Sequence, residues 1–556
     1  MTVTKNNHTF TVADYILTQL KSLGVDHIFG IPGDFILPFF EKMVESDVMH
    51  VACCNELNAG YAADGYARLK GLGVAVVTNG PGSFSIVNAV AGAYAESVPL
   101  LVISGGPVAG AYTSKPLLHH VLPDKYEASI NIFEQITTHA RLLDQPDKAT
   151  VEIDEALSIC LAEKKPVYLE IPTDVQLAAA GPPKPLDLSG YIKTDKDAAK
   201  RSVKEIARRI MQSRRTIILP GHEIHRWHLQ DKVIELLEKT GIPAASMFIG
   251  KADYLEQLPA CIGAYQGAGS LAEVRDYIED ADTVIFLGLV PSDFNLGGFT
   301  AQLSDRQTIT IWNNKIKTAQ KTVDNIAIVD VLDALLEYLP AGIYAENTAP
   351  SQIFSHKPDA DYKADAEEPL SNKRFYDRLA NFLEAGDIVL ADAGCAINIT
   401  HLQLPADATY IASGYWASIG MGFAATLGAC FAASDGQRVI ALVGDGSFQM
   451  TAQELSSMNR YGKSPIVFVV NNRGYTAERL IHDGPFNDIA AWKYHKLPDA
   501  FGGGTGMEVH TEGDLEVALE QATLFNGPGP MLIEVHIDPW DTSEAFRLMS
   551  EVLRSH

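Results

Sequence analysis

The sequence predicts an α/β protein of three doubly wound domains, each built around a parallel sheet. Short apolar runs recur along the chain with helical stretches between them, which is typical of buried parallel strands joined by helices. Two proline-bearing breaks divide the 556 residues into three parts. Because 47% of the residues are hydrophobic, a chain of this length can bury several cores.

The apolar runs and the breaks place the elements in order along the chain. The predicted strands are residues 73–78, 99–104 and 166–171 in the first part, 216–219, 283–288 and 308–312 in the second, and 439–443 and 466–470 in the third. The breaks are residues 178–185 and about 340–372, where prolines interrupt helix and sheet hydrogen bonding. We therefore predict domains at residues 1–178, 195–340 and 372–556.

The first and third domains share a sequence feature. Residues 166–171 read Pro-Val-Tyr-Leu-Glu-Ile, and residues 530–535 read Pro-Met-Leu-Ile-Glu-Val. Both segments lie near the end of their domain, so the two outer domains are predicted to share a fold.

Composition excludes several classes of partner. A formal net charge of −25 disfavours nucleic acid and anionic membranes, which are bound mainly through lysine and arginine clusters. No apolar run approaches the roughly 18 to 20 residues that span a bilayer, and the start lacks a signal-peptide core. The six cysteines show no C-x-x-C spacing, which indicates reduced thiols. We expect a cytoplasmic protein that binds neither nucleic acid nor membrane.

Two polar clusters follow neighbouring predicted strands in the third domain. Asp445, in Gly-Asp-Gly-Ser, follows strand 439–443, and Asn472 follows strand 466–470, with a predicted helix at 451–461 between them. This is a βαβ unit. The carboxyl ends of its parallel strands lie at the same edge of the sheet, so the two clusters are expected side by side.

These clusters suit a magnesium diphosphate. The carboxylate of Asp445, the amide oxygen of Asn472 and the carbonyl of Gly474 are three hard ligands, and Mg²⁺ completes such a shell with phosphate oxygens and water. Gly446 and Ser447 open the following helix, whose first N–H groups and dipole favour the same anion. The alternative is a tight turn followed by an ordinary strand-ending turn.

The segment from Gly444 to Glu478 reads GDGS, then roughly 25 residues, then N-N-x-G-Y-T-x-E. It resembles the cofactor-binding signature of thiamine-diphosphate enzymes, close to the pyruvate and indolepyruvate decarboxylase branch. The similarity extends from Val12 to about Trp540. It implies that the first domain binds the aminopyrimidine, the third binds the diphosphate, and the middle domain is structural or regulatory.

The resemblance assigns cofactor contacts. Glu56 would hydrogen-bond the pyrimidine ring and act as an indirect base, Ile419 would hold the cofactor bent, and the carbonyl of Ala417 would accept from its amino group. Glu56 could instead complement a helix dipole, and Ile419 could be a core residue. The further contacts implied are Thr78, Ala393, Gly394, Gly446 and Ser447.

Four polar residues are implied at the substrate: Asp34, His119, His120 and Glu478. Asp34 could instead be a helix N-cap. The histidines follow a predicted loop at 108–114 and could lie on the surface, although tandem histidines distinguish the decarboxylase branch. The implied pocket wall is Phe294, Ile397 and Ala477. The small Ala477, and Ile397 in place of an aromatic residue, indicate a roomier pocket.

Some segments depart from that branch or suggest other chemistry. Residues 79–83, Asn-Gly-Pro-Gly-Ser, look more like synthase relatives, and Ala393 stands where threonine is common. Residues 222–228 contain His-Glu-Ile-His, but the histidines lack the H-E-x-x-H spacing of a metalloprotease. We interpret that segment as middle-domain surface.

The predicted function is the non-oxidative decarboxylation of a 2-oxo acid, either pyruvate or a larger aliphatic or aromatic one. It would yield the aldehyde and carbon dioxide with thiamine diphosphate and Mg²⁺, and carboligation is an expected side activity. The expected assembly is a homodimer or a dimer of dimers. The alternatives are an acyloin-forming or acetohydroxyacid-type synthase, and a catalytically silent subunit that keeps the fold.

Overall fold

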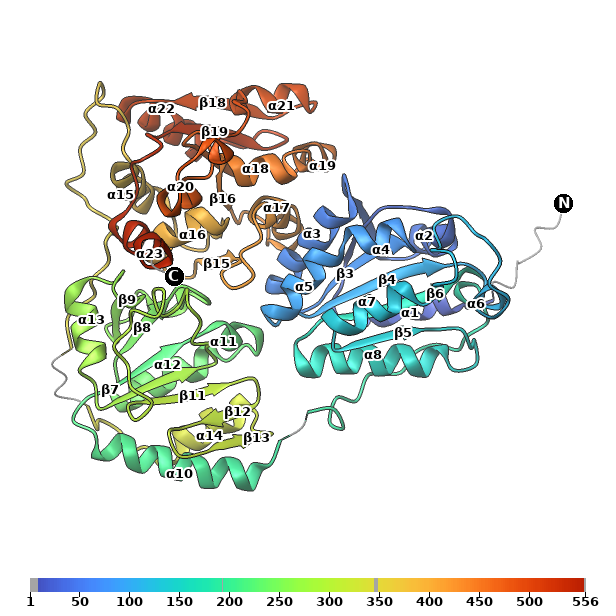
Figure 1. Cartoon of the computed structure of the whole chain (residues 1–556), viewed down its shortest axis with the longest axis horizontal. Coiled ribbons are helices and arrows are strands. Elements are labelled where there is room, and N and C mark those ends of the chain that lie inside the picture. Colours follow the sequence, from blue (N-terminus) through green and yellow to red (C-terminus); the bar gives the residue numbers. More distant parts are fainter. Residues whose placement is uncertain (1–8, 193, 345–348, 555–556) are drawn as a thin grey trace. The chain divides into compact units, whose positions relative to one another are not determined.

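Three sheets flanked by helices make up the computed structural model, which describes residues 9–192, 194–344 and 349–554 (Figure 1). The chain divides into two compact units, residues 1–192 with 427–432 and residues 193–426 with 433–556. The first unit contains one sheet and the second contains two. The predicted fold class, three domains with mostly parallel sheets, is confirmed.

The sheet of the first unit is parallel throughout, in the order β2-β1-β3-β4-β6-β5. Its strands are β1 (His27–Gly30), β2 (Met49–Ala52), β3 (Gly73–Thr78), β4 (Leu100–Gly106), β5 (His139–Leu142) and β6 (Val167–Pro172). Its helices are α1 (Val12–Ser22), α2 (Leu37–Val44), α3 (Glu56–Lys70), α4 (Pro81–Ser85), α5 (Val87–Ala95), α6 (Ala109–Ser114), α7 (Ala128–Ile136), α8 (Ala149–Glu163) and α9 (Thr173–Gln176).

The middle sheet has the order β13-β12-β11-β10-β7-β8-β9. Five strands are parallel: β7 (Thr216–Pro220), β8 (Ala244–Met247), β9 (Cys261–Tyr265), β10 (Thr283–Leu287) and β11 (Thr308–Trp312). The short edge strands β12 (Lys315–Lys317) and β13 (Thr322–Asp324) are antiparallel. The helices are α10 (Lys196–Gln212), α11 (His222–Arg226), α12 (Gln230–Thr240), α13 (Ala272–Glu279) and α14 (Ile328–Tyr338).

The third sheet is parallel, in the order β15-β14-β16-β17-β19-β18. Its strands are β14 (Ile388–Ala391), β15 (Thr409–Ala412), β16 (Val439–Gly444), β17 (Ile466–Asn471), β18 (Thr505–Val509) and β19 (Met531–His536). Its helices are α15 (Asn372–Phe382), α16 (Ala393–Thr400), α17 (Met421–Ala432), α18 (Asp445–Thr451), α19 (Glu454–Arg460), α20 (Thr476–Ile481), α21 (Leu497–Ala500), α22 (Glu512–Thr523) and α23 (Glu544–Arg554).

The first and third sheets have the same strand order when each is numbered from its own first strand. The two similar segments of the sequence are the corresponding strands β6 and β19. The prediction that the outer domains share a fold is therefore confirmed.

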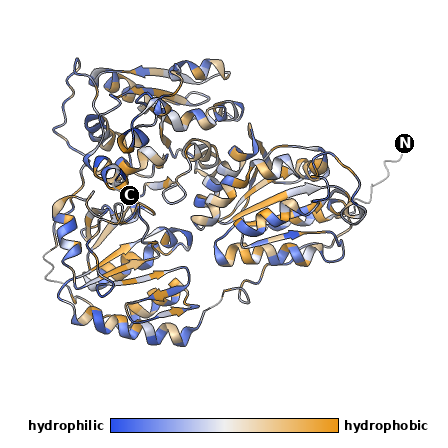
Figure 2. Ribbon diagram, viewed as in Figure 1, coloured by the Kyte–Doolittle hydropathy of each residue, from blue (hydrophilic) through white to orange (hydrophobic). Residues whose placement is uncertain are grey.

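The strands form the cores because their side chains are apolar on both faces. Five of the six residues of β16 and of β17 are buried, and all six of β3 are. Figure 2 shows mostly hydrophobic residues in the central strands, while many of the covering helices also carry hydrophilic residues. Buried apolar area of this kind is the dominant favourable contribution to folding.

The helix expected at 451–461 is present as α19, and the helix expected to open at Gly446 and Ser447 is α18, which begins at Asp445. Two other local predictions were wrong. The loop expected at 108–114 contains helix α6. Residues 222–226 form helix α11, whose His222 and Glu223 are buried, so this segment is not surface. The alternative role of Asp34, as a helix N-cap, is excluded because Gly33 holds that position before the 3₁₀ turn that Asp34 begins.

The breaks expected near 178–185 and 340–372 carry little regular structure. Among the described residues between α14 and α15 there are only isolated bridges, and the same holds between α9 and α10. None of the described helices is both long and apolar enough to cross a membrane.

Candidate active site

Asp445 is fixed at the point where β16 ends and α18 begins. Its side chain is almost fully buried, Oδ1 accepts from the N–H of Gly446 at 2.8 Å, and Oδ2 accepts from the N–H of Gly474 at 3.0 Å. Burial raises the pKa of Asp445 to about 6, although the backbone N–H groups oppose this. A buried carboxylate in this position is incompletely compensated, which a bound cation would correct.

Three oxygen atoms converge beside this carboxylate. The side-chain oxygen of Asn472 lies 3.0 Å from the carbonyl oxygen of Gly474 and 3.2 Å from Oδ1 of Asp445, while its nitrogen faces the hydroxyl of Thr476 at 3.0 Å. Adjacent ligands of an octahedral Mg²⁺ are about 2.9 Å apart, so this spacing fits the ion. Without a cation, the opposite orientation of the Asn472 side-chain amide would be favoured, because its nitrogen could then donate hydrogen bonds to the oxygens of Gly474 and Asp445.

These groups line a cavity of about 430 Å³ in the second unit. Every site residue predicted in this unit lines it: Phe294, Ala393, Gly394, Ile397, Ala417, Ile419, Asp445, Gly446, Ser447, Asn472, Gly474, Ala477 and Glu478. The cavity is large enough for a cofactor fragment with a small substrate. Predicted residues from several distant segments of the sequence thus line one cavity.

A buried aspartate holds the loop that carries Ala417 and Ile419. Oδ2 of Asp392 accepts from the N–H of Gly420 at 3.0 Å and of Gly422 at 2.9 Å. Ala417 has a φ of 53°, in the left-handed region that costs a residue with a Cβ about 1–2 kcal/mol. The carboxylate thus anchors the end of the loop that carries the strained residue, and the sequence analysis did not single out Asp392.

Asp34, His119 and His120 are brought together in the first unit. Nε2 of His119 lies 2.6 Å from Oδ2 of Asp34, and the His119 ring stacks on Phe35 at 5.1 Å. Burial raises the pKa of Asp34, but the hydrogen bond and the charges of the two histidines outweigh it, so the pKa is below its usual range. All three residues are exposed.

Glu56 and Thr78 lie at the same edge of that sheet, since each follows or ends a parallel strand. Glu56 is the first residue of α3, whose N-cap Asn55 accepts from the N–H of Asn58 at 2.8 Å. A Cβ added to Gly82 would lie 3.5 Å from Oε1 of Glu56, so α4 starts close to this carboxylate. The hydroxyl of Thr78 is buried without a hydrogen-bond partner, which suits a group that contacts a ligand.

The motif at residues 79–83 has a structural explanation. Asn79 is buried, its Oδ1 accepts from the N–H of Gly80 and the hydroxyl of Ser129, both at 2.7 Å, and its Nδ2 donates to Glu170 at 3.3 Å. A Cβ on Gly80 would lie 2.0 Å from the carbonyl oxygen of His120. Asn79 therefore shapes the turn against which the histidine pair lies.

Several lining residues were not predicted. Tyr376, Asn398, Asp541, Thr542 and Phe546 also border the 430 Å³ cavity. Phe546 lies on α23, the most strongly amphipathic helix, so its burial was foreseeable but its place beside the cavity was not. That place depends on how α23 packs against the other helices of its unit.

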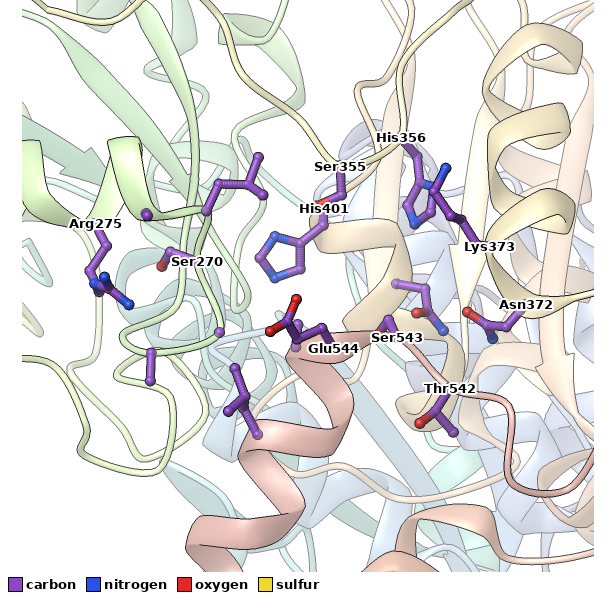
Figure 3. A pocket seen from close by; sticks show the side chains of 17 residues that line it. Ser270, Arg275, Ser355, His356, Asn372, Lys373, His401, Thr542, Ser543 and Glu544 are labelled. Atoms are coloured by element: carbon purple, nitrogen blue, oxygen red, sulfur yellow. The ribbon is translucent and has the colours of Figure 1, made fainter. Parts of the chain in front are cut away.

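A second cavity of about 680 Å³ adjoins the first and shares Asn372, Asn398 and Thr542 with it. Figure 3 shows His401 and Glu544 directed into this space, with Ser270 and Arg275 on the side of α13. It contains none of the residues predicted from the sequence. The smaller cavity, with its converging oxygens, is therefore the better candidate for the reaction site.

Comparison with known proteins agrees with this geometry. Three models of thiamine pyrophosphate enzymes match the chain: the N-terminal TPP binding domain at residues 10–127, the central domain at 203–339 and the C-terminal TPP binding domain at 392–535. The chain is thus a thiamine-diphosphate enzyme.

Full-length relatives narrow the class. A pyruvate decarboxylase of Aspergillus fumigatus is 33% identical over 98% of this chain and 97% of its own length. Pyruvate decarboxylase 1 of Pisum sativum is 34% identical over 96% of this chain and 91% of its own length. An alpha-keto-acid decarboxylase of Mycolicibacterium paratuberculosis is 36% identical over 92% of this chain and 91% of its own length. The chain belongs to the family of thiamine-diphosphate-dependent 2-oxo-acid decarboxylases, which are lyases.

Proposed function

We propose that this protein converts a 2-oxo acid to the aldehyde and carbon dioxide, with Mg²⁺ and thiamine diphosphate bound in the cavity at Asp445. The convergence of oxygens from Asp445, Asn472 and Gly474 supports this most directly. These residues would hold the cation, and the N–H groups that open α18 would face the diphosphate. The chemistry that the cofactor supplies when bound is an electron sink for the carbon that loses carbon dioxide.

The side chains of the first unit would handle protons. Glu56 would exchange a proton with the pyrimidine ring. Asp34 and His119 share a hydrogen bond of 2.6 Å, so a proton can pass between them, and His120 lies beside them with its ring 4.7 Å from that of His119. Such groups can act as general acid and base when the product is protonated and released. Glu478, at the cavity of the other unit, would contact the substrate carboxylate or the product.

The walls of the cavity support a substrate larger than pyruvate. Ala477 and Ile397 line it, and neither fills it as an aromatic residue would. We propose that branched aliphatic and aromatic 2-oxo acids are accepted alongside pyruvate. Phe294 would form the remaining apolar side of the pocket.

The synthase alternative rests on residues 79–83. The side chain of Asn79 is directed into the sheet, toward Glu170 and Ser129, which gives this motif a packing role. The motif therefore favours a synthase less than its sequence suggested. Carboligation remains a proposed side activity.

The proposed oligomeric state rests on the different roles of the two outer domains in binding the cofactor. In the family, the first domain of one chain faces the third domain of another, so we propose a homodimer, or a dimer of dimers, as the active form. A fully active monomer in sedimentation under assay conditions would contradict this.

The deciding experiment is a product analysis over a panel of 2-oxo acids, with pyruvate, a branched-chain acid, phenylpyruvate and indolepyruvate. We expect stoichiometric aldehyde and carbon dioxide, with minor hydroxyketone. Hydroxyketone as the main product would instead support the synthase. Inactivity toward every acid, in protein loaded with cofactor and Mg²⁺, would support a silent subunit.

A further inference from the structure

The third sheet carries the same three residues, Glu-Val-His, at the ends of two neighbouring strands. They are residues 508–510, at the end of β18, and residues 534–536, at the end of β19. The two strands are parallel neighbours in the sheet (Figure 1). They pair Glu508 with Glu534 and Val509 with Val535. Side chains alternate along a strand, so the two glutamates and two histidines share one face while both valines enter the core.

We propose that these paired segments, together with His495, form a second cation site that takes a divalent transition metal such as Zn²⁺. The site is separate from the oxygen site at Asp445 and does not depend on the proposed function. Imidazole and carboxylate ligands suit Zn²⁺, Co²⁺ or Ni²⁺, whereas Mg²⁺ prefers oxygen alone. The two sites would therefore select different ions.

The ligand atoms are already close enough to share an ion. Oε1 of Glu508 lies 3.3 Å from Nε2 of His510 and 3.2 Å from Nε2 of His536. Donor atoms around a tetrahedral Zn²⁺ are about 3.3 Å apart, so both spacings match. The ligating atoms of these three residues all lie within 4.8 Å of one another.

A second carboxylate orients the imidazole above the strands. Oε2 of Glu534 lies 2.6 Å from Nδ1 of His495, which favours a proton on Nδ1 and leaves Nε2 with its lone pair. That Nε2 lies 3.7 Å from Oε2 of Glu508. A carboxylate behind a ligating histidine is the usual outer support of a zinc site.

One of the two stacked imidazole rings must rotate before both can bind the same ion. The rings of His510 and His536 are stacked, 4.1 Å apart and 11° from parallel, and an ion lies in the plane of every imidazole that ligates it. Both rings cannot ligate in this orientation. His536 is held between Glu508 and Glu534, while the side chain of His510 is 57% exposed, so His510 is the ring that would turn.

The cluster is connected to the loop at the cofactor cavity. Oε1 of Glu534 accepts from Nδ2 of Asn471 at 2.7 Å and lies 3.3 Å from Nε2 of His536. Asn471 precedes Asn472, one of the three residues with converging oxygens. An ion bound by the cluster would thus restrict the motion of Glu534, which holds the loop that carries Asn472 through its hydrogen bond with Asn471.

The test is Zn²⁺ titration of untagged protein saturated with thiamine diphosphate and Mg²⁺, followed by calorimetry. We expect one Zn²⁺ per chain with a micromolar or tighter Kd that excess Mg²⁺ does not change. Co²⁺ should give the visible absorption of a nitrogen-ligated ion. His536→Gln and Glu508→Gln should each weaken binding at least about 10-fold.

His228→Asn is the matched control, because His228 is exposed and lies outside the cluster. It should bind Zn²⁺ as the wild type does. If His536→Gln fails to fold by circular dichroism, His510→Gln replaces it, since His510 is the more exposed ring. The proposal is overturned if wild-type protein binds no Zn²⁺ beyond what Mg²⁺ displaces, or if the cluster variants bind as tightly as the control.

Discussion

Glu170 and Glu534 occupy the same position in two sheets of identical strand order, each as the fourth residue of its strand. Both carboxylates are buried, but their partners differ. Glu170 is bound by neutral donors, the hydroxyls of Tyr112 and Tyr168. Glu534 instead lies against an imidazole, at 2.6 Å from His495. Equivalent positions have thus acquired different electrostatic surroundings.

This difference predicts a pH-dependent stability for the first unit. Burial raises the pKa of Glu170 to about 7, although the hydroxyl hydrogen bonds oppose it. A raised carboxyl pKa means that the folded state binds the proton more tightly than the unfolded state. The free energy of unfolding should therefore fall as pH rises from about 4.5 to about 7, by about 3 kcal/mol.

Glu170→Gln should remove that part of the pH profile. Relative to wild type, the variant should gain stability between pH 5 and 8 in denaturant unfolding. Glu41→Gln, at an exposed position on α2, serves as the control and should follow wild type. Parallel curves for Glu170→Gln and wild type would show that Glu170 does not titrate in this range.

Asp445→Ala should abolish tight retention of the cofactor. Removing the charged ligand leaves the cation and the diphosphate without compensation at the converging oxygens of Asn472 and Gly474. Cofactor content after extensive dialysis is the measurement. Normal holoenzyme recovered from this variant would rule out the assignment.

Glu56→Gln should slow exchange of the thiazolium proton by orders of magnitude while the fold survives. The amide preserves the shape at the start of α3 but cannot share a proton with the pyrimidine. Quenched-flow NMR of the folded, cofactor-saturated variant measures the exchange rate directly. A rate equal to that of wild type would refute the role of Glu56.

Ala477→Ile should narrow the substrate range. Ala477 lines the cavity, and each methylene in an apolar pocket changes discrimination by about 1–3 kcal/mol. The ratio of kcat/KM for phenylpyruvate to that for pyruvate should therefore fall by 10-fold or more. A wild-type enzyme confined to pyruvate, or an unchanged ratio in the variant, would remove the argument from pocket volume.

Ala417→Gly should stabilise the protein by about 1 kcal/mol, contrary to the usual effect of glycine. The φ of 53° at Ala417 is strained for alanine but ordinary for glycine. The midpoint of guanidinium unfolding of the holoenzyme measures the change. Ala500→Gly, at the end of α21 with a negative φ, is the control and should not stabilise. A loss of stability at Ala417 would mean that no strain is stored there.

The sequence predicted the parts of the fold that depend on local pattern. Continuous apolar runs marked the buried strands, such as β3 and β17, because both faces of a parallel sheet are covered. The short strands β12 and β13 were missed because three residues are too few to show an alternating pattern, and helix α6 was missed because its six residues make fewer than two helical turns.

The sequence could predict those site residues that directly follow the ends of neighbouring strands. Asp445 and Asn472 follow adjacent strands, so topology alone places them together. Phe546 and Asp541 reach the same cavity through packing of the last helix, and no local pattern carries that information. The loop that carries Ala417 is likewise anchored at Gly420 by Asp392, a contact between residues far apart in the sequence.

The wall between the two cavities limits how this enzyme can be redesigned. Asn372, Asn398 and Thr542 border both spaces, and the carbonyl oxygens of the two asparagine side chains are buried without partners. Trimming these side chains to admit bulkier acids would join a cavity of about 430 Å³ to one of about 680 Å³. Variants meant to admit bulkier acids should therefore be trimmed at Ile397, which borders the smaller cavity and not the larger one, and left intact at this partition.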